Sequence, residues 1–113
     1  MAFVTEGLFM VMEDKFSEIR QKALPILKPY ISRLAVFGSI ARQDATDTSD
    51  IDLLILLKPS HSRPKLGLFK WIEIEEKLKA ILGRDIDLVS EEDISPYIRP
   101  YVEKDKVIIY EER

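Results

Sequence analysis

The sequence contains no cysteine, and it has only one histidine, one tryptophan and four glycines. The absence of cysteine excludes disulfides, thiolate zinc sites and cysteine nucleophiles, and it fits a reducing cytoplasm. No apolar run approaches the roughly 20 residues that a helix needs to cross a bilayer, so we expect no membrane contact. The 17 basic residues are outnumbered by 20 acidic ones, and a net charge of −3 gives no broad positive field to hold nucleic acid. We therefore expect a cytoplasmic protein that does not bind nucleic acid directly.

The 113 residues, of which 46% are hydrophobic and 33% charged, suffice for one hydrophobic core. We expect a single domain over residues 1–113. Residues 1–11 could be a flexible tail, because translation could also begin at Met10 or Met12. The apolar run from Leu8 to Met12 lacks a basic leader and a cleavage site, which argues against a signal peptide.

Hydrophobic periodicity predicts the order of the elements. Apolar side chains recur every three to four residues from Met12 to Tyr30 and from Leu66 to Leu82, as is typical of amphipathic helices. Pro29 helps to end the first helix, and Gly83 is placed to cap the second. Short apolar runs predict four strands, at Leu34–Phe37, Ile51–Leu57, Asp85–Val89 and Val107–Tyr110. A brief helix could open at residues 91–93. The fold class is therefore α/β, with a mixed β-sheet of about four strands and helices packed on it.

Aspartates are concentrated between the first and second predicted strands. Four of the nine in the chain lie within nine residues, at Asp44, Asp47, Asp50 and Asp52. Side chains two positions apart on a strand share a face, so Asp50 and Asp52 point the same way. If the next strand is a neighbour, Asp87 joins them, and three carboxylates form a site for a hard cation such as Mg²⁺. Asp85 shares a face with Asp87 and stays open as the third ligand.

Simpler readings of these acids also exist. Any one of them taken alone is more simply a solvated or turn-capping residue, and Asp44 and Asp47 are expected to line the connecting turn. An EF-hand calcium loop does not fit, because the twelfth position counted from Asp44 or Asp47 is Ile55 or Lys58 rather than glutamate.

Gly38 and Ser39 follow the first predicted strand and supply a second candidate feature. A glycine there lets the backbone approach a ligand closely, and the serine offers a hydroxyl and an amide to phosphate oxygens. Arg42 could contact phosphate or form a surface ion pair. His61 lies in a polar loop and is expected to be exposed, and Phe69 and Trp71 are expected to pack in the core. The chain has no P-loop, nucleophile elbow or dinucleotide-binding fingerprint.

The interval between these features carries a resemblance to a known family. Gly38-Ser39, ten further residues and Asp50-Ile51-Asp52, with Asp87 in a later strand, resemble the GS-x10-DxD pattern of the DNA polymerase β-like nucleotidyltransferase superfamily. At this length the chain looks most similar to the minimal nucleotidyltransferases (MNT), many of which are antitoxins paired with a HEPN-domain toxin. One departure is Gln43, where family members often have glycine. Gln does not readily adopt a positive φ, which puts the local turn geometry in question.

The resemblance implies a palm-like nucleotidyltransferase fold and a chemistry. Gly38 and Ser39, with Arg42 as a further candidate, would bind the triphosphate of ATP, and Asp50, Asp52 and Asp87 would be the catalytic ligands of Mg²⁺. It also implies an antitoxin that transfers AMP to a tyrosine of a partner HEPN ribonuclease.

The short chain leaves little surface to recognise an acceptor, so recognition has to come from a partner protein or from a homo- or hetero-oligomer. Three alternatives stay open at this point. They are a small-molecule nucleotidyltransferase with a separate acceptor-binding subunit, an antitoxin that acts by binding alone, and a metal-binding domain without catalysis.

Overall fold

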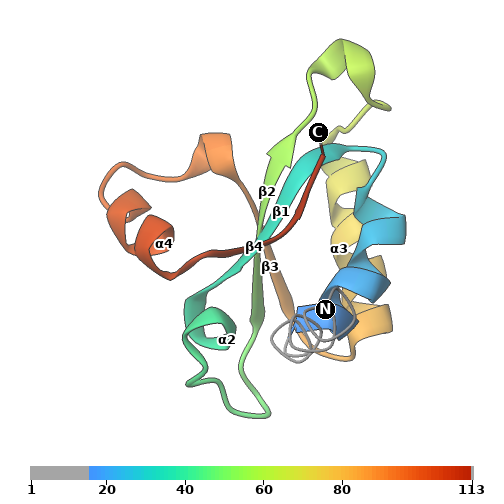
Figure 1. Ribbon diagram of the computed structural model, residues 1–113. Helices are drawn as coiled ribbons and strands as arrows, with labels where there is room; N and C mark the ends of the chain where they lie inside the picture. Colours follow the sequence, from blue (N-terminus) through green and yellow to red (C-terminus); the bar gives the residue numbers. More distant parts are fainter. Residues whose placement is uncertain (1–15, 113) are drawn as a thin grey trace, which may run out of the picture.

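The computed structural model describes residues 16–112, and in this part of the chain four strands form one mixed sheet (Figure 1). The strands are β1 (Ile31–Phe37), β2 (Ile51–Leu57), β3 (Ile86–Ser90) and β4 (Val107–Glu111), in the order β3-β2-β1-β4. β1 pairs antiparallel with both β2 and β4, whereas β2 pairs parallel with β3. A parallel pair needs a long crossover connection, which a helix supplies here. The predicted fold class is confirmed.

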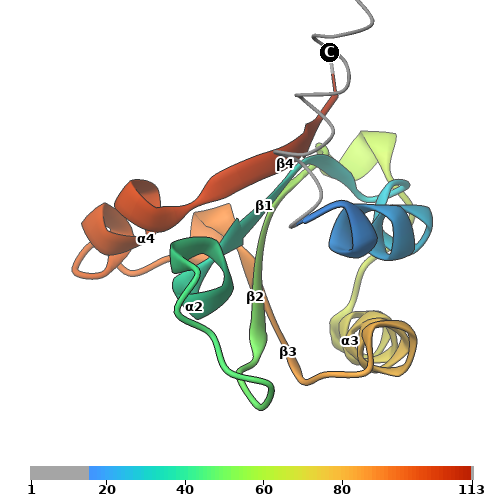
Figure 2. The same ribbon diagram turned by 60° about the horizontal axis from the view of Figure 1, so that its bottom comes forward.

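Helices cover both faces of the sheet (Figures 1 and 2). A first helix, described over residues 16–27, and α3 (Leu68–Leu82) lie on one side. On the other side α4 (Arg99–Asp105) packs on the sheet, and α2 (Gly38–Arg42) lies beside α4. Two single turns of 3-10 helix, η1 (Ser60–Ser62) and η2 (Glu91–Asp93), complete the connections. No helix within residues 16–112 is long and apolar enough to cross a membrane.

The central strands carry buried side chains on both faces, as their continuous apolar runs predict. The larger core joins the first helix and α3 to the sheet, and its fully buried members include Ala23, Leu34, Val36, Leu53 and Leu78. The smaller core, on the α4 side, consists of Ala35, Leu54, Ile94 and Val102. Alternation along β1 and β2 therefore sends neighbouring residues to opposite layers.

Most predicted elements are present, and two short helices are additional. The first helix ends at residue 27 and a turn containing Pro29 follows, while the predicted part at residues 12–15 and the proposed tail at residues 1–11 lie outside the described residues. Gly83 caps α3 with φ of 70°. α2 and α4 leave little periodicity to detect, because α2 has five residues and α4 buries only Val102.

The predicted inner face of α3 is partly wrong. Trp71 packs against the larger core together with buried Ile74 and Leu78, as expected for Trp71. Phe69, predicted to be a core residue, is 87% exposed. Two positions along a helix correspond to a rotation of about 200°, so Phe69 and Trp71 cannot share the buried stripe. Leu68, at 71% exposure, also lies on the solvent side.

Candidate active site

Gly38 and Asp52 lie in contact at one end of the central strand pair. Phe37, the last residue of β1, is the register partner of Asp52 on β2, so the next residue passes over the Asp52 carboxylate. Gly38 has φ of 72°, and a Cβ built there would overlap Oδ2 of Asp52 and lie 2.9 Å from its Cγ. Only glycine supplies both this backbone conformation and this space. Ser39 follows in the first turn of α2.

The parallel pairing of β2 and β3 brings Asp87 opposite Asp52. The two residues are direct register partners, and Asp50 precedes β2 by one residue. Burial, together with the nearby charges of Asp87 and Asp50, raises the pKa of the Asp52 carboxyl to about 6, while Arg42 acts in the opposite direction. Asp50 and Asp87 therefore both lie close enough to Asp52, at one end of the sheet, to act on its charge.

This shift predicts a pH-dependent stability for the protein without added metal. The pKa of Asp52 is raised above the unfolded value of 3.8, so its contribution to stability is present below pH 4 and is lost as the pH rises through about 6. Asp52→Asn should therefore raise the free energy of unfolding at pH 7 by about 1 kcal/mol, a value reduced for solvent screening, and change it little at pH 3.5. Urea denaturation at the two pH values measures this. Asp93→Asn, an exposed acid in η2, is the control, and an equal gain at both pH values would contradict the assignment.

The three carboxylates do not form a closed cage of ligands. In the described part of the chain, no three His, Asp or Glu side chains stand close enough together to be a ready metal site. The donor set nevertheless fits a hard divalent cation, because it consists of carboxylate oxygens, and Asp52 loses its proton reluctantly beside two like charges. Mg²⁺ commonly takes only one or two carboxylates, and substrate phosphates supply further ligands. The ligand roles of Asp50, Asp52 and Asp87 stay predictions.

Asp85 lies beside the loop that leads into Asp50. It lines an open hollow of about 450 Å³ together with Ser49, Lys79 and Arg84. Asp85 is not among the charges that act on Asp52. This placement favours Asp87 over Asp85 as the third carboxylate.

Arg84 fixes the loop that leads into Asp50, a role that sequence reasoning did not identify. Its Nε donates to the Ser49 carbonyl (3.0 Å), and its Nη2 donates to the carbonyls of Thr46 and Ser49 (both 2.6 Å). The Ile51 amide also donates to the Asp85 carbonyl (2.9 Å). No sequence pattern reveals these contacts, because an arginine next to a helix cap usually points to solvent.

Arg42 takes part in surface ion pairs. Its Nε lies 3.2 Å from Asp44 and its Nη1 lies 3.2 Å from Asp105 of α4. Of the two roles left open from the sequence, the ion pair is present, and the contact with phosphate stays a prediction. Asp47 lies in the connecting turn, as expected, and His61 is exposed in η1.

Gln43 has a left-handed backbone. Its φ is 66°, and it is the only residue other than glycine with a positive φ in the described range. It ends α2, and its amide donates to the Ile40 carbonyl at 3.2 Å. The turn expected for glycine is therefore formed with glutamine, at a conformational cost of about 1 kcal/mol.

Replacement of this residue should stabilise the protein. Gln43→Gly should raise the free energy of unfolding by about 0.5–1 kcal/mol, because glycine adopts φ of 66° without steric strain. The same change at Gln21, exposed in the first helix, should lower it by about 1 kcal/mol. Chemical denaturation of both variants distinguishes the two effects. A loss of stability in both would mean that Gln43 is not strained.

Known proteins are similar to this chain in sequence. The sequence profile described as "Nucleotidyltransferase domain" matches residues 13–109. A Methanocaldococcus jannaschii protein, provisionally named a protein adenylyltransferase, is 37% identical over 99 residues, which cover 85% of this chain and 96% of that protein. Protein adenylyltransferase MntA of Thermococcus cleftensis is 34% identical over 79 residues, or 70% of this chain and 75% of the relative.

Solved structures agree at the level of the fold. A protein described as a minimal nucleotidyltransferase matches with a TM-score of 0.66 and 28% identity, over 83% of this chain and 92% of its own. A second match is to a structure from Shewanella oneidensis, which contains a tri-AMPylated HEPN toxin in complex with an MNT antitoxin. The TM-score is 0.59 and the identity is 22%, over 80% of this chain and 68% of the matched chain. The second likeness shows a common fold.

Proposed function

Because the chain belongs to the family of nucleotidyltransferase domains, we propose that it is a Mg²⁺-dependent antitoxin that transfers AMP from ATP to a tyrosine of a HEPN ribonuclease toxin. The observation that carries the proposal is the contact between Gly38 and Asp52, with Asp87 in register on the neighbouring strand. It brings a backbone able to approach phosphate next to carboxylates able to hold a cation.

In the proposed reaction, the tyrosine oxygen attacks the α-phosphorus of ATP. A new oxygen–phosphorus bond forms, the bond to the β-phosphate bridge breaks, and pyrophosphate leaves. Asp50, Asp52 and Asp87 would hold Mg²⁺, which when bound neutralises charge on the attacking and leaving oxygens. Asp87 would also help to accept the phenolic proton, which matters because a tyrosine has a pKa near 10 in water.

The remaining residues of the site would position the nucleotide. Gly38 and Ser39 would bind the triphosphate through the backbone and the serine hydroxyl. Arg42 would add a positive charge near it, since its field already reaches Asp52. Because the four strands within residues 16–112 form one sheet, we propose that the chain acts as a single domain. We also propose a cytoplasmic location, which the absence of cysteine fits.

The acceptor is proposed from relatives and from chemistry. The relatives above carry the name of protein adenylyltransferases, and a protein with the same fold is complexed with an AMPylated HEPN toxin. A protein acceptor also fits a chain that the catalytic fold nearly fills, because the acceptor then brings its own recognition surface.

Metal dependence gives a simple prediction. A ligand that binds only the folded state stabilises it in proportion to its occupancy. Mg²⁺ with ATP at millimolar concentration should therefore raise the melting temperature, whereas ATP with a chelator should raise it much less. Differential scanning fluorimetry measures both. Equal shifts in the two conditions, or none, would contradict a metal–nucleotide site.

The proposed function is tested by co-expression with the HEPN-domain protein of the same genome. Intact mass spectrometry should show this partner carrying one or more AMP groups, and its ribonuclease activity should be lost. The Asp87→Asn enzyme should still bind the partner but leave its mass unchanged and its ribonuclease active. If Asp87→Asn neutralises the toxin as well as the wild type does, inhibition is by binding alone. Transfer to a small molecule and to no protein would favour the small-molecule alternative.

A further inference from the structure

α4 and the turn before it present large apolar side chains to solvent. Three of the exposed large apolar residues within residues 16–112 fall in five consecutive positions, at Tyr97, Ile98 and Tyr101. Tyr97 is 88% exposed and Tyr101 is 70% exposed. We call these three residues the α4 aromatic surface. Val102 is the only buried residue of α4, so most of this helix does not serve the core.

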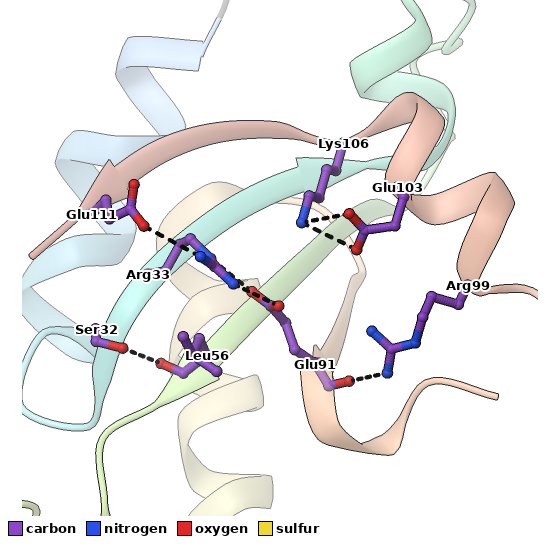
Figure 3. A network of polar contacts seen from close by, with 8 residues as sticks. All are labelled: Ser32, Arg33, Leu56, Glu91, Arg99, Glu103, Lys106 and Glu111. Atoms are coloured by element: carbon purple, nitrogen blue, oxygen red, sulfur yellow. Dashed lines mark hydrogen bonds and ion pairs between the residues drawn. The ribbon is translucent and has the colours of Figure 1, made fainter. Parts of the chain in front are cut away.

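Polar contacts nevertheless hold α4 firmly at both ends. At its start, Nη2 of Arg99 donates to the Glu91 carbonyl (2.9 Å). The Glu91 side chain accepts from Nε and Nη2 of Arg33 on β1, at 2.9 and 2.8 Å, which lowers the pKa of this buried carboxyl (Figure 3). At the other end of the helix, Asp105 pairs with Arg42. A helix of seven residues is not stable alone, so these contacts fix its position.

The helix that carries part of the α4 aromatic surface is joined to α2 at its other end, near Asp105. α4 contacts α2, the helix that begins at Gly38, and the two lie on the same side of the molecule (Figure 2). The ion pair between Asp105 and Arg42 joins them directly, and Arg42 is close enough to act on Asp52. A protein that covers α4 would therefore reach the carboxylates.

We infer that the α4 aromatic surface is the docking site of the protein acceptor, an inference that rests on the proposed function. Tyrosine is enriched among the side chains that carry binding energy, because it combines a large apolar ring with a hydroxyl. The exposed acids Glu92 and Asp93 precede the surface. The acceptor should therefore carry its target tyrosine beside an apolar patch flanked by lysine and arginine.

The second exposed apolar patch provides the matched control. Leu68 and Phe69, at the start of α3, are exposed to the same degree as the two tyrosines. They lie on the side of the sheet away from α2 and α4 (Figures 1 and 2). An acceptor bound there could not reach Asp52.

The test measures binding of the purified HEPN-domain protein from the same genome by isothermal titration calorimetry without nucleotide. Tyr97→Ala with Tyr101→Ala should weaken binding by at least about 30-fold, the effect of losing one interface anchor. Leu68→Ala with Phe69→Ala should change it by less than about 3-fold. The thermal shift with Mg²⁺ and ATP, which reports the catalytic site, should match wild type in the tyrosine variant and show that the fold is intact.

Several results would overturn the inference. They are wild-type affinity in the tyrosine variant, an equal loss in the α3 control, and no binding by the wild type. Self-association of the chain alone that the tyrosine changes abolish, measured by analytical ultracentrifugation, would assign the surface to a second copy instead. If binding depends on the tyrosines but the wild type adds no AMP to the partner, the docking site stands and the proposed function fails.

Discussion

Asp50→Asn combined with Asp52→Asn should abolish nucleotide transfer while the protein remains folded. Asp52 lies in the field of both Asp50 and Asp87, and removal of charge from such a site typically lowers the rate by about 10³-fold or more. The fold should not suffer, because the ionised form of Asp52 is disfavoured by burial and by like charges. Transfer of radiolabel from ATP, together with a thermal melt, measures both effects.

The control for this variant removes two charges at positions away from Gly38. Asp47→Asn with Glu76→Gln, at two exposed acids, changes the net charge equally and should keep most of the transfer activity. Ser39→Ala should reduce transfer by about 10-fold, because the serine amide remains available to phosphate. Full activity in the Asp50/Asp52 variant, or its unfolding, would show that these aspartates have structural roles.

Gly38→Ala should also abolish transfer. The reason is steric, because this substitution leaves every charge in place. The added methyl would overlap the Asp52 carboxylate, so the side chain has to move away from Asp87. Positive φ at a residue other than glycine costs a further ~1 kcal/mol or more of stability. The same transfer assay, with a denaturation curve, measures the outcome.

Gly83→Ala separates the two contributions. Gly83 has nearly the same φ, 70°, but a Cβ there would meet nothing within 4 Å. This variant should lose a similar ~1 kcal/mol of stability and keep its transfer activity. If the two alanine variants behave alike, backbone strain alone explains the loss, and the contact with Asp52 has no catalytic importance.

The parts of the fold that depend on periodic burial could be predicted from the sequence. The segments around Ile51–Leu57 and Asp85–Val89 read as strands because each contains a short apolar run. In β2 this run is buried on both faces, whereas in β3 the exposed Asp87 lies between buried Ile86 and Leu88. The fixed interval between Gly38 and Asp50 predicts a site near these residues, and the roles of its residues stay predictions. The sequence puts the turn at Gln43 in question, and the structure forms this turn with a positive φ. Each of these features is local in the chain.

Other features depend on contacts between distant residues. Phe69 and Trp71 are both aromatic and lie two positions apart on a helix. The position of the sheet against α3 decides which of the two is buried. α4 gave no signal, because it depends on Arg99 and Glu91 rather than on an apolar stripe. The choice between Asp85 and Asp87 required the register of β3 against β2, which composition cannot reveal.

The order of the strands in the sheet also governs how the protein becomes active during translation. The ribosome delivers β1 and β2 first, and these neighbours can pair as soon as both have emerged, which brings Gly38 to Asp52. Asp87 arrives only after α3 has been made, and α4 follows still later. Pairing of β3 with β2 closes a longer loop and is slower. A nascent chain therefore brings its carboxylates together before its α4 aromatic surface has formed, so the proposed docking site is completed after the candidate active site.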